Sequence, residues 1–196
     1  KLATLAYTRL LQDQKAQAVI AADSALAASK TVKIRFLAGR IFAAAGQTAR
    51  SRKLAAELAS ELQPEPQAYA KLIEGEIALA SGDPRGAVKI FTEAKNLLDT
   101  WIGRFDLGRA YLAAGLFTEA DSEFDQCIRR RGEAVSLFLD ESPTHGYFPP
   151  VYYYLGRVRE GMKSSGFADS YRTYLSIREK AGEDPLLADV RKRAGS

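Results

Sequence analysis

Apolar residues recur along the chain at intervals of three and four positions, in stretches that isolated Gly and Pro residues separate. Ala120, Phe124 and Cys127 illustrate the pattern, since they fall on one stripe of a helix. Alanine, the strongest helix former, is the commonest residue, and no strand-rich segment emerges. The pattern predicts an all-α protein of short helices joined by tight turns.

One stretch of this pattern returns 33 residues later in the chain. The shared positions are a small Gly, a turn Gly, a small Ala and a large Phe: Gly75, Gly82, Ala87 and Phe91 in the first copy, and Gly108, Gly115, Ala120 and Phe124 in the second. Self-similarity at a period between about 20 and 50 residues is typical of a repeat solenoid. Each copy is therefore expected to be one helical hairpin.

The shared residue types have physical roles in such a hairpin. Two helices approach closely where one carries no bulky side chain, which Gly75 and Gly108 provide, and Phe91 and Phe124 are expected to fill the gap toward the next unit. A left-handed glycine is expected at the end of each first helix. After the first of these, Asp83-Pro84 predicts a capped second helix that begins with proline.

The pattern resembles the tetratricopeptide repeat family, whose consensus places Leu-Gly, Tyr, Gly, Ala and Phe in this order. The segments that carry the resemblance are DLGRAYLAAGLFTEADSEF (106–124) and EGEIALASGDPRGAVKIFTEA (74–94), the second with Glu74 where Leu is usual. The resemblance implies an α-solenoid, a right-handed superhelix of helical hairpins with a concave groove.

Weaker copies extend the pattern on both sides. Gly39 and Gly46 mark one upstream, and Gly156 and Tyr171 mark one downstream that lies 15 residues later than the period requires. We therefore expect one domain, 1–196, with approximate repeats 1–31, 32–66, 68–100, 101–131 and 149–182, an insert at 132–148 and a capping helix at 185–193. Within the insert, 133–140 is apolar enough for a short helix.

A second resemblance concerns residues 64–193. The segments EFDQCIRRRGEAVSL and PPVYYYLGRVREGMKSSGF, with the final Asp-Pro helix, are similar to the C-terminal repeat region of bacterial serine/threonine protein kinases and related multidomain regulators. The chain itself carries no kinase glycine-rich loop, HRD-like triplet or DFG.

Composition narrows the classes of function. The 28 basic and 24 acidic residues interleave along most of the chain and give a net charge of +4, which is short of the continuous basic stripe of a nucleic-acid binder. No apolar run reaches the roughly 20 residues of a membrane-spanning helix. The chain begins at Lys1 without Met, so we expect an excised fragment, with targeting or membrane segments upstream left open. The compartment stays unknown from the sequence, with the cytoplasm favoured.

Candidate chemistry is sparse. Cys127 stands where the tetratricopeptide pattern has a small Ala, which indicates a buried, inert thiol. His145 lies in a loop segment without a second histidine or a nucleophile motif. One cysteine and one histidine cannot form a cysteine-based zinc site. We therefore expect no catalytic residue, no metal and no cofactor.

The tetratricopeptide resemblance implies that the first helices line the concave groove. The repeat geometry then assigns the following residues to it: Phe36, Arg40, Leu72, Glu76, Phe105, Arg109, Tyr153 and Arg157. Tyr152, by contrast, is expected in the core. The three arginines could pair with carboxylates of an acidic peptide or a chain terminus, or with acidic residues of the chain itself, such as Glu76 and Glu160.

These observations predict a non-catalytic scaffold that binds a protein or a peptide. The alternative is an intramolecular regulatory domain, or a self-associating one, of a bacterial signalling protein such as a serine/threonine kinase. A homo-oligomer is compatible with both hypotheses.

Overall fold

The computed structural model describes residues 1–136, 148–182 and 184–195, and within these residues every regular element is a helix. The helices are α1 (Leu2–Leu11), α2 (Lys15–Ala28), α3 (Val32–Ala44), α4 (Thr48–Ala59), α5 (Pro64–Ala80), α6 (Pro84–Leu97), α7 (Trp101–Ala113), α8 (Phe117–Arg129), α9 (Arg131–Ser136), α10 (Phe148–Gly161), α11 (Phe167–Arg178) and α12 (Leu187–Ala194). The all-α prediction is confirmed.

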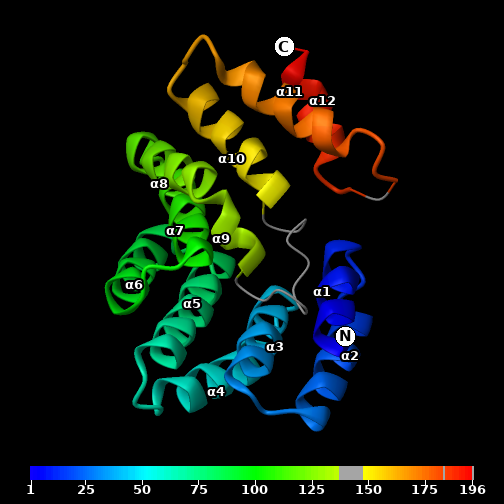
Figure 1. Ribbon diagram of the computed structural model, residues 1–196, viewed down its shortest axis with the longest axis vertical. Helices are drawn as coiled ribbons and strands as arrows, with labels where there is room; N and C mark the ends of the chain where they lie inside the picture. The colour runs from blue at the N-terminus through cyan, green and yellow to red at the C-terminus, as the bar shows by residue number, and fades with distance from the viewer. Residues whose placement is uncertain (137–147, 183, 196) are drawn as a thin grey trace.

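Helices that follow one another in the chain pack against one another, apart from the short α9, which packs against α7. We call α1, α3, α5, α7 and α10 the first helices, and their partners α2, α4, α6, α8 and α11 the second helices. Each first helix also contacts the next first helix, so the pairs stack side by side. Figure 1 shows the stack following a curve from the blue N-terminus to the red C-terminus, which brings the first and last pairs to the same side of the molecule.

Glycines end the first helices α3, α5 and α7. Gly46, Gly82 and Gly115 have φ angles of +78°, +79° and +74°, a region that other residues rarely adopt. After Gly82, the Asp83 N–H reaches back to the Ala78 carbonyl at 2.9 Å, which satisfies a carbonyl at the helix end. The left-handed conformation predicted for Gly82 and Gly115 is confirmed.

The second helix α6 begins as the sequence predicts. Pro84 is its first residue, a position where a backbone N–H would have no partner within the helix, so the N–H that proline lacks is not missed. The Asp83 carboxylate accepts a hydrogen bond from the Gly86 N–H at 2.8 Å. Asp83 therefore caps the helix.

The repeat glycines lie under aromatic rings. A Cβ on Gly75 would lie 2.2 Å from Phe91 Cε1, and one on Gly108 would lie 2.8 Å from Phe124 Cε1. The predicted close approach of the helices is therefore present. Each Phe ring covers the glycine of its own pair, where the second helix crosses the first. Phe124 also reaches the next pair, as predicted, because its ring stacks on Tyr154 of α10.

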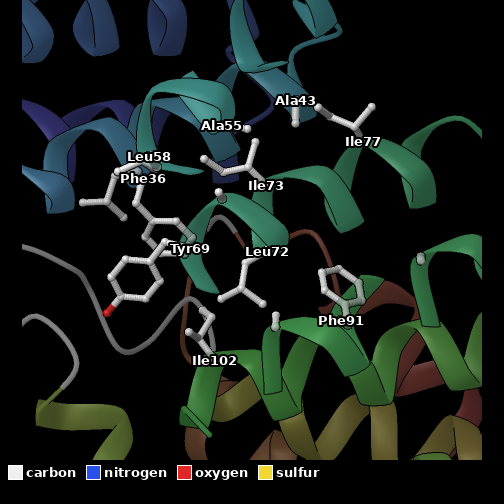
Figure 2. Packing of buried hydrophobic residues seen from close by; sticks show 14 of the residues in the cluster. Phe36, Ala43, Ala55, Leu58, Tyr69, Leu72, Ile73, Ile77, Phe91 and Ile102 are labelled. Atoms are coloured by element: carbon white, nitrogen blue, oxygen red, sulfur yellow. The ribbon is translucent and has the colours of Figure 1, made fainter. Parts of the chain in front are cut away.

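Neighbouring pairs share a continuous core. Figure 2 shows its central cluster, in which Phe36 of α3 stacks on Tyr69 of α5 with ring centroids 4.4 Å apart. Gly39 plays a different part from Gly75, since a Cβ on Gly39 would lie 2.5 Å from Ile73 Cδ1 of the next pair. Gly39 thus allows α3 of one pair to approach α5 of the next pair closely.

Cys127 is fully buried on α8. Its carbonyl accepts a hydrogen bond from Trp101 Nε1 at 2.8 Å, which ties α8 to the start of α7. Burial is the main reason that the pKa of the Cys127 thiol is raised, so the reactive thiolate is disfavoured. The interpretation of Cys127 as a buried residue is confirmed.

The last pair joins the stack directly, because α10 packs on both α7 and α8. The short helix expected at 133–140 corresponds in part to α9, which ends at Ser136, while residues 137–140 and His145 lie outside the described residues. The predicted capping helix at 185–193 begins at Leu187 instead of Pro185. Pro185 and Leu186 form a turn, and the Leu186 N–H donates to the Asp184 carboxylate at 3.0 Å.

Candidate binding groove

The first helices surround a narrow cavity with a volume of about 260 Å³. All five first helices contribute to its wall, together with Pro185 and Leu186 before α12, whereas no second-helix residue of the described chain lines it. Its charged groups are Arg40, Glu76 and Arg109. The cavity therefore lies on the inner side of the stack.

A wider cavity of about 650 Å³ adjoins it and shares the side chains of Arg109 and Tyr154. Helices α5, α7 and α10 supply most of this wall, with Phe117 at the start of α8 and Arg193 on α12. We call the two cavities together the groove. Concave, partly apolar clefts with a few charged groups are the usual form of binding sites.

An arginine lies over an aromatic ring in three of the first helices. The pairs, with the distance from Arg Cζ to the ring centroid, are Arg40 over Phe36 (5.6 Å), Arg109 over Phe105 (6.0 Å) and Arg157 over Tyr153 (5.9 Å). The partners are one helical turn apart, so they share a face. The cation–π attraction holds each guanidinium along the helix that carries it.

Arg40, Glu76, Asp106 and Arg109 form a network, which we call the inner network, across α3, α5 and α7. Arg40 donates hydrogen bonds to both carboxylate oxygens of Asp106, one of them at 3.1 Å, and to Glu76 at 3.3 Å. Arg109 donates to Glu76 and, at 3.0 Å, to Asp106. The Asp106 side chain is 0% exposed and that of Arg40 is 10% exposed. Two cations and two carboxylates balance, so the inner network is neutral when both acids are ionised.

The two acids of the inner network differ in their pKa. Burial opposes ionisation of Glu76, but the charges of Arg109 and Arg40 outweigh it and lower the Glu76 pKa to about 2. Burial raises the pKa of Asp106, and the neighbouring Glu76 charge adds to this, against the opposing charge of Arg40. The Asp106 carboxylate is therefore costly to bury and depends on its arginines.

Arg157 differs from the other groove arginines in its partners. It donates to the Tyr153 hydroxyl at 3.0 Å, and no carboxylate of the described residues forms an ion pair with it. Arg193, across the same cavity, is held by Glu160 at 2.6 Å and Asp189 at 2.8 Å. Among the described residues, Arg157 is thus the groove arginine whose charge no carboxylate partner balances, which leaves it available to an acidic ligand.

Of the eight residues that the sequence assigned to the groove, five line it and three are buried in the core. Arg40, Glu76, Phe105, Arg109 and Arg157 line it. Phe36, Leu72 and Tyr153 are core residues instead. Phe36 and Leu72 are covered by the neighbouring pairs, and α12 covers Tyr153, whose hydroxyl bonds Asp189 at 2.9 Å.

The sequence did not point to Tyr154, which lines the groove, or to Asp106, which is buried behind the groove wall in the inner network, and Tyr152 also lies differently from the prediction. Asp106, the centre of the inner network, stands out in the sequence only as a carboxylate within the apolar helix Trp101–Ala113. Tyr154 lines both cavities and stacks on Phe124 with centroids 5.8 Å apart. Tyr152, which was expected in the core, is only partly buried. A run of three tyrosines gives no signal for which one faces the groove.

Asp184 holds the turn that closes the narrow cavity. Its carboxylate accepts hydrogen bonds from the Tyr174 hydroxyl at 2.6 Å and from Arg178 at 2.8 Å, besides the Leu186 N–H. Burial opposes ionisation of Asp184, but these hydrogen bonds outweigh it and lower its pKa below the ordinary value of 3.8. The charged form is therefore favoured in the folded protein.

We expect Asp184→Asn to lower the free energy of unfolding by about 1–3 kcal/mol at pH 7, because it removes hydrogen bonds to a charged group. A depressed pKa stabilises the fold above pH 3.8, and this stabilisation is lost as the pH falls through the folded-state value. The difference in the free energy of unfolding between wild type and variant should therefore shrink as the pH is lowered from 5 to 2. Urea unfolding across this range measures it. A difference that is constant with pH would contradict the assignment.

Within the described ranges, no group of three or more His, Cys, Asp or Glu side chains is placed to hold a metal ion. None of the helices in those ranges combines the length and apolar composition that crossing a membrane requires. No protein-family model matches the sequence, and no curated protein is significantly similar to it.

Proposed function

We propose that the chain is a tetratricopeptide-like right-handed superhelix that binds an extended peptide segment of another protein in its groove. Three features support the superhelix: the 33-residue repeat, the stacked helix pairs and the left-handed glycines that end three first helices. A stack of pairs presents a long inner surface, which suits an extended ligand.

The observation that carries the proposal is Arg157 at the wall of the wider cavity without a carboxylate partner in the described part of the chain. Leu79, Leu112 and Phe117 form the apolar part of the same wall. A guanidinium beside an apolar surface is suited to a carboxylate that neighbours a hydrophobic side chain. The proposed ligand is therefore a peptide with an acidic residue next to an apolar one.

Selection of a random peptide library on the protein, followed by fluorescence polarisation of the enriched peptides, tests this proposal. We expect acidic–apolar peptides to be enriched, and Arg157→Glu to weaken their binding at least tenfold by reversing the charge at the ligand. Arg85→Glu is the matched control, because Arg85 is exposed on the second helix α6. Equal losses in both variants, or enrichment of peptides without acidic residues, would count against the groove.

A second candidate function is self-association, as the resemblance to repeat regions of bacterial signalling proteins also allows. The first pair exposes large apolar side chains, with Leu5 44% and Ile20 65% exposed. Ends of a helical stack are normally covered by polar residues. Self-association predicts that the molar mass in solution rises with protein concentration. It also predicts that the Ile20→Glu variant keeps the mass of one chain.

A further inference from the structure

A second cleft lies away from the groove, between α2 and α4 and over α3. Its volume is about 310 Å³. We call it the basic cleft, because Lys30, Arg35, Arg50 and Lys53 line it together with a single acid, Glu57. Helices α2 and α4 contribute no described residue to the groove, so the two sites are separate.

The charges in the basic cleft are not balanced. Arg35 pairs with Glu61, and Arg50 pairs with Asp23, which makes two neutral pairs. Lys30, Lys53 and Glu57 form no ion pair with any described side chain. One positive charge is therefore left over at the cleft wall. An anion that entered the cleft would be attracted by it.

The guanidinium of Arg35 has an unused donor. Its Nε is buried and has no hydrogen-bond partner in the described part of the chain, while its Nη2 is held by Glu61. Buried polar groups in folded proteins almost always have a partner, so an orphaned donor at a cleft wall needs an explanation. The oxygen of a ligand would supply the missing acceptor if the Arg35 side chain turned to bring Nε, which protein atoms now cover, to the surface of the cleft.

Arg50 is also fixed in place. Its Cζ lies 3.9 Å from the centroid of the Phe42 ring, and Asp23 holds its Nη2. Arg50 stands in the first turn of α4, where the helix dipole disfavours a cation and an acid would be the favoured residue. A bound anion would relieve this cost.

We propose that the basic cleft binds a small molecule that carries a phosphate monoester on an apolar group. A phosphate monoester has a charge of about −1.5 to −2 at pH 7 and three strong acceptor oxygens, enough for Arg35 Nε and both lysines. The apolar group would lie on Leu26, Phe42 and Leu54, which complete the wall. The cleft volume lies at the lower end of the range for small ligands.

Isothermal titration calorimetry with phenyl phosphate tests the proposal on the intact chain. We expect phenyl phosphate to bind at least tenfold more tightly than inorganic phosphate, because only the former contacts the apolar wall. The double variant Lys30→Gln/Lys53→Gln should lose at least tenfold in affinity. Its charge-matched control is Lys89→Gln/Lys180→Gln, which removes two exposed lysines elsewhere and should bind as wild type does.

Arg35→Lys gives a sharper comparison, since it keeps the charge and removes the Nε donor. We expect it to weaken phenyl phosphate binding at least threefold with the circular dichroism spectrum unchanged. No binding of phenyl phosphate, equal binding by inorganic phosphate, or unchanged binding by the Lys30/Lys53 variant would overturn the proposal. A phosphoserine peptide that binds more tightly than phenyl phosphate would also overturn it, because the ligand would then be a phosphorylated chain.

Discussion

Asp106→Ala should lower the free energy of unfolding by about 3–5 kcal/mol, the cost of breaking a buried ion pair by removing one partner. Asp106 is fully buried and accepts hydrogen bonds from both Arg40 and Arg109. Without it, two arginines share Glu76 alone, and one positive charge is left uncompensated in the wall of the groove. Urea unfolding at neutral pH measures the change.

The matched control for this variant is Asp125→Ala. Asp125 also pairs with an arginine, Arg129, but the two side chains are 41% and 70% exposed. Exposed ion pairs contribute little, so the control should change stability by about 0.5 kcal/mol or less. The double variant Arg40→Met/Asp106→Leu removes one whole pair and should recover much of the loss. If Asp106→Ala lowers the free energy of unfolding by no more than Asp125→Ala does, the inner network does not hold the first helices together.

Gly108→Leu should lower the free energy of unfolding by about 1–3 kcal/mol or more, because the larger side chain overpacks the contact between α7 and α8. Even a Cβ at this position would lie 2.8 Å from Phe124 Cε1, and the Phe124 ring is fully buried, so it has no room to move. The melting temperature of the variant, followed by circular dichroism, gives the result.

Two further variants separate this contact from a general effect of losing glycine. Gly132→Ala is the control, because a Cβ on Gly132 meets nothing within 4 Å. Gly108→Leu/Phe124→Ala should be less destabilised than the sum of its two single changes, since the leucine occupies the space that the ring leaves. Additive losses would mean that Gly108 and Phe124 are not in contact.

The helix pairs could be predicted from the sequence because their determinants are local. Gly82 and Gly115 need a left-handed conformation, and Asp83 caps the helix that begins at the next residue. The pairing of Gly75 with Phe91 repeats at a fixed interval, so a single sequence contains two examples of it. Such signals depend on neighbours in the chain and on the helical period, which a sequence displays directly.

The partners of the groove side chains could not be predicted in the same way. Arg40 and Asp106 are 66 positions apart and meet only because α3, α5 and α7 stack with a particular offset. Asp106 directly precedes Leu107-Gly108, and the sequence does not show whether its side chain faces the interior or the solvent. Tyr153 was placed in the groove because its position follows the repeat, but α12 covers it, and a helix beyond the last repeat does not follow the period.

Nitrogen-15 NMR of the protein, titrated with an enriched acidic–apolar peptide, shows whether the inner face of the stack binds the peptide. We expect the amide shifts to change along α5, α7 and α10, around Arg109, Tyr154 and Arg157, and to stay the same along α2, α4 and α6. Shift changes confined to the second helices, or none at saturating peptide, would contradict binding at the inner face.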